Sequence, residues 1–139
     1  MTEIKPPMKK EFVDKLVRAF KEGSKYPSLS IEQPGATIEL AYEIQQLFVA
    51  ELQTEKAGYK AAVTSEPVQQ IMSIKAPVSG VLFSSGEFQT NSTIDDSKDL
   101  LIETELGFQT NKDITKPVEP AKVYTLFECY YPMIEIASP

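Results

Sequence analysis

The sequence predicts an α+β fold, with a helical first part and a strand-rich second part, in a single domain over residues 1–139. Two apolar stripes with the spacing of an α-helix lie within residues 1–57. From residue 58 onward this spacing disappears, and residues 100–110 alternate between two faces as a β-strand does. Because strands follow helices instead of alternating with them, the order favours α+β over a doubly wound α/β sheet.

Two long helices are expected in the first part. The first carries one apolar stripe that ends near Gly23 and consists of Phe12, Val13, Leu16, Val17 and Phe20. The second runs from about Thr37 to Lys56, is ended by Gly58, and has a predicted buried face of Leu40, Ala41, Ile44, Leu47, Phe48 and Leu52. A loop that contains two prolines separates the helices at residues 26–35. Both stripes are expected to face the core.

The rest of the chain predicts short elements joined by polar loops. Residues 84–99 are polar, contain clustered acids, and are expected to form irregular surface. In chain order, the other expected elements are a strand at 59–64, a helix at 67–72 capped by Ser65, a turn and strand at 77–83, a strand at 100–110, a turn at 111–113, a helix at 121–130 and a strand at 133–137.

Composition limits the possible chemistry. The net charge of −6 gives no basic surface for nucleic acid or an anionic membrane, and no apolar run reaches the roughly 18 residues of a membrane span. Cys129 is the only cysteine, which excludes an internal disulfide and suits a reducing cytoplasm, the expected location. The chain has no histidine, which excludes Ser-His and Cys-His catalysis and His-ligated zinc. Any chemistry must therefore use carboxylates, lysine, tyrosine, hydroxyl groups or a hard metal ion.

Three glutamates are the strongest candidates for a metal site. Glu103 and Glu105 are two residues apart on one expected strand, so both carboxylates leave the same face about 7 Å apart. Glu135 lies between two isoleucines on the last expected strand, where an uncompensated charge is costly. Solvated glutamates on an outer face are the plain alternative, which the neighbouring Leu101 and Gly107 disfavour. Carboxylates without histidine or cysteine are typical ligands of Mg²⁺ or Mn²⁺.

Several short motifs occur in a specific order over nearly the whole chain. They are Ala41–Gln45, Gly58–Lys60, Thr64–Gln69, the residues Pro77, Gly80, Leu82 and Phe83, then Ile102–Glu105, Asp113 and Pro132–Ile136. In this order they resemble the N-terminal half of the 2-keto-4-pentenoate hydratases and their 4-oxalocrotonate decarboxylase relatives, in the fumarylacetoacetate-hydrolase superfamily. The resemblance implies a helical region at 1–57, followed at 58–139 by the first part of a mixed β-roll with the metal-ligand strands.

The resemblance also implies a site and an activity. Glu103, Glu105 and Glu135 match the metal ligands of the family, and Lys60 matches its active-site lysine, which reaches the carboxylate or the C2 oxygen of the substrate. From the pattern alone, Lys60 would be a solvated surface residue. The implied enzyme is a lyase that uses Mg²⁺ or Mn²⁺ to add water to a 2-hydroxy-2,4-dienoate in the catabolism of aromatic compounds. Decarboxylation of a 2-oxo-enoate of the 4-oxalocrotonate type is the alternative reaction.

Two departures from the family pattern matter. An acid implicated in proton transfer often follows the proline where this chain has Val78 after Pro77, and Glu87 and Asp95 are candidate replacements. Family members are also much longer, so we expect a truncated version of the fold that binds metal, turns over substrate poorly and self-associates into homo-oligomers. A non-catalytic remnant or assembly module is the alternative function. The dienoate substituent, the preferred metal and the reason for the short length stay open.

Overall fold

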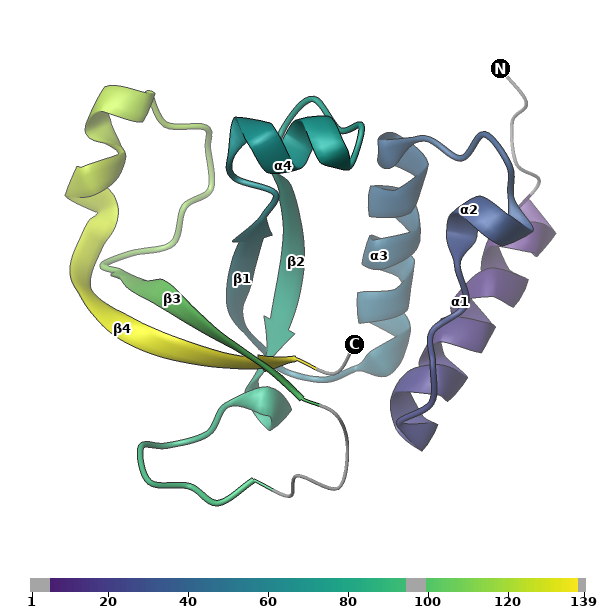
Figure 1. The fold of residues 1–139 in the computed structure, drawn as a ribbon, viewed down its shortest axis with the longest axis horizontal. Coiled ribbons are helices and arrows are strands. Elements are labelled where there is room, and N and C mark those ends of the chain that lie inside the picture. The colour runs from purple at the N-terminus through teal and green to yellow at the C-terminus, as the bar shows by residue number, and fades with distance from the viewer. Residues whose placement is uncertain (1–5, 95–99, 138–139) are drawn as a thin grey trace. The chain divides into compact units, whose positions relative to one another are not determined.

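The computed structural model describes residues 6–94 and 100–137. Its helices precede most of its strands, as predicted, and the α+β class is confirmed. In chain order the elements are α1 (Pro6–Glu22), α2 (Leu29–Glu32), α3 (Ile38–Leu52), β1 (Lys56–Ala62), α4 (Glu66–Ile71), β2 (Val78–Phe83), the 3₁₀ helix η1 (Ser84–Gly86), β3 (Leu101–Thr110), the 3₁₀ helix η2 (Pro120–Leu126) and β4 (Phe127–Ala137) (Figure 1). None of the helices in these two ranges is long and apolar enough to cross a membrane.

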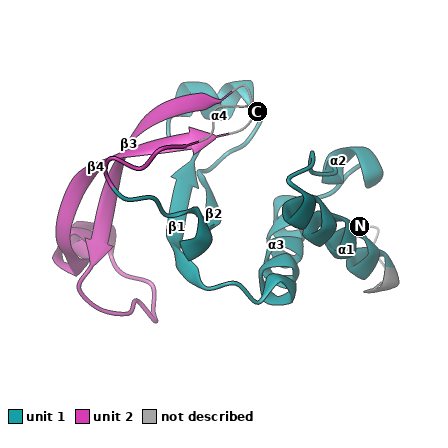
Figure 2. Cartoon of the chain, turned by 90° about the horizontal axis from the view of Figure 1, so that it is seen from below, with its two compact units in different colours: residues 1–89 teal, residues 90–139 magenta. Residues whose placement is uncertain are grey.

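The chain forms two compact units, residues 1–89 and residues 90–139 (Figure 2). The first unit contains helices α1 to α4 together with strands β1 and β2, which form a two-stranded antiparallel sheet. The second unit contains β3, η2 and β4, and its two strands form another antiparallel sheet. Each unit therefore carries one strand pair, and the candidate site residues are divided between these pairs.

The core of the first unit lies between α1 and α3, which run side by side (Figure 1). Its buried side chains are Phe12, Val13, Val17 and Ile44, and Leu16, Leu29, Leu40, Phe48 and Leu52 pack around them. Phe20, at the end of the predicted stripe, makes an edge contact with Phe48, with ring centroids 6.0 Å apart. The stripe predicted for the first helix is therefore confirmed as core-facing.

The buried face of α3 differs in part from the prediction. Leu47 is 46% exposed and Ala41 is also exposed, whereas Val49, outside the predicted face, is only 7% exposed. The difference arises because α3 contacts β2 as well as α1: the side-chain amide of Gln45 donates a hydrogen bond to the Ser79 carbonyl at 3.2 Å. At 3.6 residues per turn, the side of the helix that carries Gln45 and Val49 is turned away from Leu47.

The predicted end of the second long helix is also wrong. Helix α3 begins after Thr37, whose hydroxyl accepts a hydrogen bond from the Leu40 N–H at 3.3 Å. It ends at Leu52, because Gln53 takes a left-handed conformation with a φ of 52°. Gly58 does not end the helix but lies inside strand β1.

In the second unit, the predicted helix at 121–130 is wrong. Helix η2 is a 3₁₀ helix that ends at Leu126, and β4 starts at Phe127 instead of Met133. The Asn111 N–H donates to the Leu126 carbonyl at 2.9 Å, and the Asn111 side chain donates to the Thr125 carbonyl at 3.1 Å. These carbonyls are therefore not available to continue a helix, and the aromatic residues that follow favour a strand.

The remaining short elements lie close to their predicted positions. Helix α4 starts after Ser65 as expected, although the Ser65 side chain makes no capping hydrogen bond. Strand β2 begins at Val78, after the expected turn. The expected irregular surface at 84–99 begins with η1, and its residues 95–99 lie outside the described residues.

Candidate metal centre

The candidate metal ligands lie on the strand pair β3–β4 (Figure 1). In its register Glu103 is opposite Glu135, and Glu105 is opposite Met133. Residues two apart on a strand share a face, as do directly opposed residues of antiparallel strands, so the three glutamates leave the same face. One carboxylate oxygen of each lies within 4.8 Å of the others. The structure thus brings together the three glutamates that the sequence indicates.

The cluster concentrates negative charge on a partly open surface. Glu103 and Glu105 are exposed, and Glu135 is half-buried. Within residues 6–94 and 100–137, no other three cysteine, aspartate or glutamate side chains converge in this way. Like charges on opposed residues of a sheet destabilise the pairing. A bound cation would remove this repulsion. Exposed acidic groups are also common without a bound ion, so the chemistry of the three donors decides whether the cluster fits a metal.

The donor set fits a hard divalent cation. All three donors are carboxylate oxygens, the ligands that Mg²⁺, Mn²⁺ and Ca²⁺ prefer. Cys129 lies farther along the same face, opposite Gln109, and its thiol donates to the Gln109 side chain at 3.6 Å. An octahedral cation held by three carboxylates keeps further positions for water or for a chelating substrate.

Lys60, the predicted catalytic residue, belongs to the first unit. It is half-buried in β1, opposite Gly80 of β2. A Cβ atom added to Gly80 would lie 3.3 Å from Lys60 Cγ and 3.8 Å from Lys60 Cδ, so the aliphatic stem of the lysine lies over the glycine. A packed stem restricts the positions of the ammonium group more than a solvated stem does.

Helix α3 fixes the strand next to Lys60. The Ser79 N–H donates to the Tyr42 hydroxyl at 3.0 Å, and the Gln45 side chain donates to the Ser79 carbonyl at 3.2 Å. Hydrogen bonding from the side chain and backbone of Ser79 holds the pKa of the Tyr42 phenol below its ordinary value. Sequence reasoning assigns Tyr42 and Gln45 no role, and their i, i+3 spacing is the signal that points to a shared helix face.

The structure describes one of the two expected replacements for the missing proton-transfer acid. Val78 is half-buried at the start of β2, and its side chain has no ionisable group. Glu87 is exposed directly after η1. Asp95 lies outside the described residues. Of the two expected replacements, only Glu87 therefore lies among the described residues.

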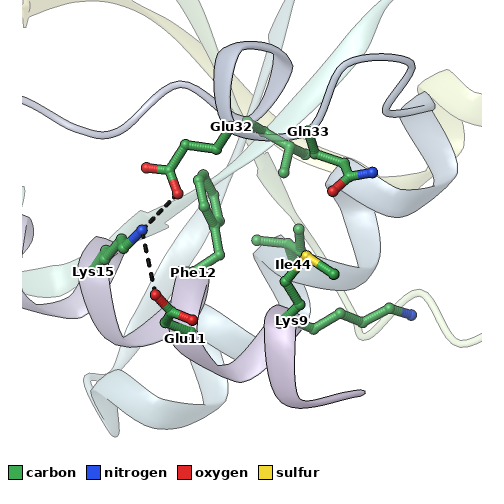
Figure 3. A pocket seen from close by; sticks show the side chains of 9 residues that line it. Lys9, Glu11, Phe12, Lys15, Glu32, Gln33 and Ile44 are labelled. Carbon is green, nitrogen blue, oxygen red and sulfur yellow. Dashed lines mark hydrogen bonds and ion pairs between the residues drawn. The ribbon is translucent and has the colours of Figure 1, made fainter. Parts of the chain in front are cut away.

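A pocket in the first unit lies between α1, α2 and α3 (Figure 3). Lys15 lies between two carboxylates on its rim, 2.7 Å from Glu32 and 3.7 Å from Glu11. Hydrogen bonding to Glu32, followed by weaker attraction to Glu11, raises the pKa of Lys15. Lys9 is paired with Glu43. Because these lysines already have carboxylate partners, this pocket is a poor site for an anionic substrate.

Comparison with known proteins supports the fold. No protein-family model matches the chain, and no curated protein matches it in sequence. The chain is similar to the solved structure of 4-oxalocrotonate decarboxylase from Pseudomonas putida G7 complexed with magnesium and adipate, with a TM-score of 0.86, 17% identity, and coverage of 99% of this chain and 55% of that chain. It is also similar to that enzyme complexed with calcium and acetate, with a TM-score of 0.88, 17% identity, and coverage of 99% and 56%. The chain thus has the α+β fold of these structures and spans about half their length.

Proposed function

We propose that this chain carries the metal centre of a lyase of the 2-keto-4-pentenoate hydratase and 4-oxalocrotonate decarboxylase type. The observation that carries the proposal is the convergence of Glu103, Glu105 and Glu135, with carboxylate oxygens within 4.8 Å of one another. The fold shared with a decarboxylase solved with magnesium supports Mg²⁺ or Mn²⁺ as the cofactor. The proposed substrate is a 2-hydroxy-2,4-dienoate or a 2-oxo-enoate. Adipate and acetate in the solved structures are carboxylates too, which supports this class of substrate.

The three glutamates would hold the cation from two directions. Glu103 and Glu105 come from β3 and Glu135 comes from β4, so hydrogen bonding between the strands fixes the distances between the ligands. A bound divalent cation supplies Lewis-acid polarisation to a substrate that chelates it through the C1 carboxylate and the C2 oxygen. Three carboxylates leave room for such a two-point contact.

Lys60 is the proposed partner for the negative charge of the substrate. Its ammonium group would donate hydrogen bonds to the carboxylate or to the C2 oxygen, where charge develops during the reaction. Electrostatic stabilisation is effective when the charged group is held in place beforehand. The contact of the Lys60 stem with Gly80 supports this role.

The two candidate reactions are hydration, which is the reaction expected from the sequence, and decarboxylation. In hydration, the oxygen of water bonds to the far end of the conjugated system and a substrate carbon takes up a proton. In decarboxylation, the bond to the distal carboxylate breaks, its electron pair enters the conjugated system, and CO₂ leaves. Decarboxylation requires no deprotonated water, so it is favoured by Val78, which stands where the family often has an acid. The similarity to a solved decarboxylase also favours decarboxylation.

Turnover assays separate these reactions. The chain is incubated with 2-hydroxypenta-2,4-dienoate or with a 2-oxo-hexenedioate, each with Mg²⁺ or Mn²⁺. A hydratase consumes the dienoate, whereas a decarboxylase releases CO₂ from the dicarboxylate. Metal binding without either reaction would favour the alternative of a non-catalytic assembly module.

Calorimetric titration with Mn²⁺ tests the metal centre itself. Replacing Glu103 or Glu105 by Gln is expected to weaken Mn²⁺ binding about tenfold or more, because a charged ligand is lost. The matched control is Glu128→Gln, which removes the same charge from an exposed position of β4 and should bind as the wild type does. Equal Mn²⁺ affinity in the wild type and Glu103→Gln would contradict the assignment of Glu103 as a metal ligand.

A second copy of the chain is the proposed partner of the opposite face of β3–β4. Phe127 of that face is half-buried against Phe108. Six other large apolar side chains of the face are at least 38% exposed; these are Ile102, Leu106, Phe108, Tyr130, Ile134 and Ile136. Contiguous exposed apolar surface of this kind is typical of association sites. The two-stranded sheet also has two edges that can pair with another strand. This face supports a homo-oligomer, which both the lyase and the assembly module could form.

A further inference from the structure

Gly107 is the one buried residue among the ten residues of β3. Two side chains of β4 cover it. A Cβ atom added to Gly107 would lie 2.7 Å from Tyr131 Cε2 and 2.9 Å from Met133 Cγ, and closer still to the Met133 sulfur. Real Cβ atoms do not approach neighbouring atoms so closely. Any residue other than glycine would therefore displace Met133 or Tyr131.

The backbone of Gly107 does not itself require glycine. Its φ lies outside the left-handed region, unlike that of Gly35, which is 84°. An alanine could adopt the same extended conformation. Glycine inside a strand often marks a place where another group approaches closely. The feature that requires glycine at position 107 is thus the space that Met133 and Tyr131 occupy.

That space adjoins the candidate metal centre. Two successive opposed pairs of β3–β4 carry the cluster: Glu103 with Glu135, and Glu105 with Met133. Three of these four positions are glutamates, and Met133 is the fourth. Its side chain leans over Gly107, which lies on the side of Glu105 away from Glu103. The thioether is therefore directed away from the carboxylates.

We propose that Gly107 is a positioning residue that determines the metal preference of the cluster by keeping the sulfur of Met133 away from it. The inference rests on the proposed metal function. With Met133 over Gly107, the three carboxylates would hold a cation through oxygen atoms alone, which favours hard cations such as Mg²⁺ and Mn²⁺. A side chain at position 107 would push the thioether towards Glu105. There the sulfur would crowd a hard cation and offer a ligand to a soft one.

Titrations of Gly107→Ala with Mn²⁺ and with Cd²⁺, a soft cation, test the proposal. The ratio of Mn²⁺ affinity to Cd²⁺ affinity is expected to fall about tenfold or more relative to the wild type, the scale of a change next to the ligands. In Gly107→Ala/Met133→Leu the side chain still crowds the site but has no sulfur. This variant should bind Mn²⁺ weakly and lose the gain in Cd²⁺ affinity.

The variant Gly107→Ala/Met133→Ala keeps the proposal testable if Gly107→Ala does not fold. Removing the Met133 side chain relieves the contacts with its sulfur and Cγ. The remaining contact is with the Tyr131 ring, which is 42% exposed and can move towards solvent. This variant should therefore fold and bind Mn²⁺ as Met133→Ala alone does. Circular dichroism establishes folding before each titration. Weak Mn²⁺ binding by the folded double variant, or an unchanged affinity ratio in Gly107→Ala, would overturn the role of Gly107. Failure of the wild type to bind Mn²⁺ would instead overturn the metal centre itself.

Discussion

The two strand pairs of this chain are supported in different ways. A two-stranded sheet is only marginally stable by itself in water. In the first unit, α3 binds the Ser79 backbone of β2 through two side chains, and Phe83 contacts Phe20 with ring centroids 5.7 Å apart. In the second unit, the one buried apolar side chain among the described residues is Leu126. The pair β1–β2 is thus held by a packed helical layer, whereas β3–β4 exposes acids on one face and apolar side chains on the other.

This difference indicates what each pair requires for its role. Lys60, on the supported pair, is already restrained by the packing of its stem over Gly80. The three glutamates, on the exposed pair, repel one another and gain most from a bound cation. We therefore expect a metal to stabilise the second strand pair and to leave the first nearly unchanged.

The largest expected effect is on turnover and comes from a residue of the strand pair β1–β2. Lys60→Ala should lower turnover about 100-fold, the scale of losing one preorganised charged group, and should leave Mn²⁺ affinity unchanged. Lys56→Ala, which removes an exposed lysine from the same strand, is the matched control. Steady-state kinetics on both candidate substrates give the first result and calorimetry the second. A Lys60→Ala variant with wild-type turnover would return Lys60 to the class of surface lysines.

Metal binding should change the exposed pair. At a free Mn²⁺ concentration about 100 times the dissociation constant, linkage predicts about 2.7 kcal/mol of added stability. Hydrogen exchange should show this as slower exchange of the amides of β3 and β4, with little change in β1 and β2. Glu103→Gln should lose most of the protection. Equal protection of both strand pairs by Mn²⁺ would show that the cation does not act on β3–β4 in particular.

Self-association should depend on the apolar face of β3–β4. Ile134 is 67% exposed at the centre of that face, and Ile134→Lys is expected to raise the dissociation constant of the oligomer about tenfold or more, because it places a charge in the interface. Gln109→Lys adds the same charge to the opposite face of the same sheet and is the control. Analytical ultracentrifugation over a range of concentrations measures both. A wild-type chain that stays monomeric at every concentration would exclude this interface.

The sequence predicts those features of the fold that depend on local periodicity. The stripe of α1 and the alternation of β3 are visible because each buries or exposes residues at a fixed spacing. The end of α3 and the start of β4 depend on single residues, Gln53 and Asn111, whose conformations and hydrogen bonds leave no periodic signal. Both errors occur at the ends of elements, where tertiary contacts decide the outcome.

The sequence likewise predicts only a part of the candidate site. Sequence reasoning finds Glu103, Glu105 and Glu135, because acids on strongly apolar strands are conspicuous. It does not give the register that sets Glu103 opposite Glu135, because a long connection with no fixed turn type separates the two strands. The position of Met133 over Gly107 follows from that register, so only the structure reveals it.

The smallest expected effect is a pH dependence in the first unit that does not involve metal. A hydrogen bond from its own backbone N–H, and then one from the Thr37 side chain, hold the pKa of Glu39 below the ordinary 4.5. The unfolded chain therefore takes up this proton first as the pH falls, so the stabilisation is complete above about pH 4.5 and is lost as the pH falls through the lower folded value. The free energies of unfolding of the wild type and Glu39→Gln, from denaturant titrations without metal, should differ by a constant amount near neutral pH. This difference should shrink in acid. A difference between the wild type and Glu39→Gln that stays constant down to about pH 3 would contradict the charge-dependent capping of α3.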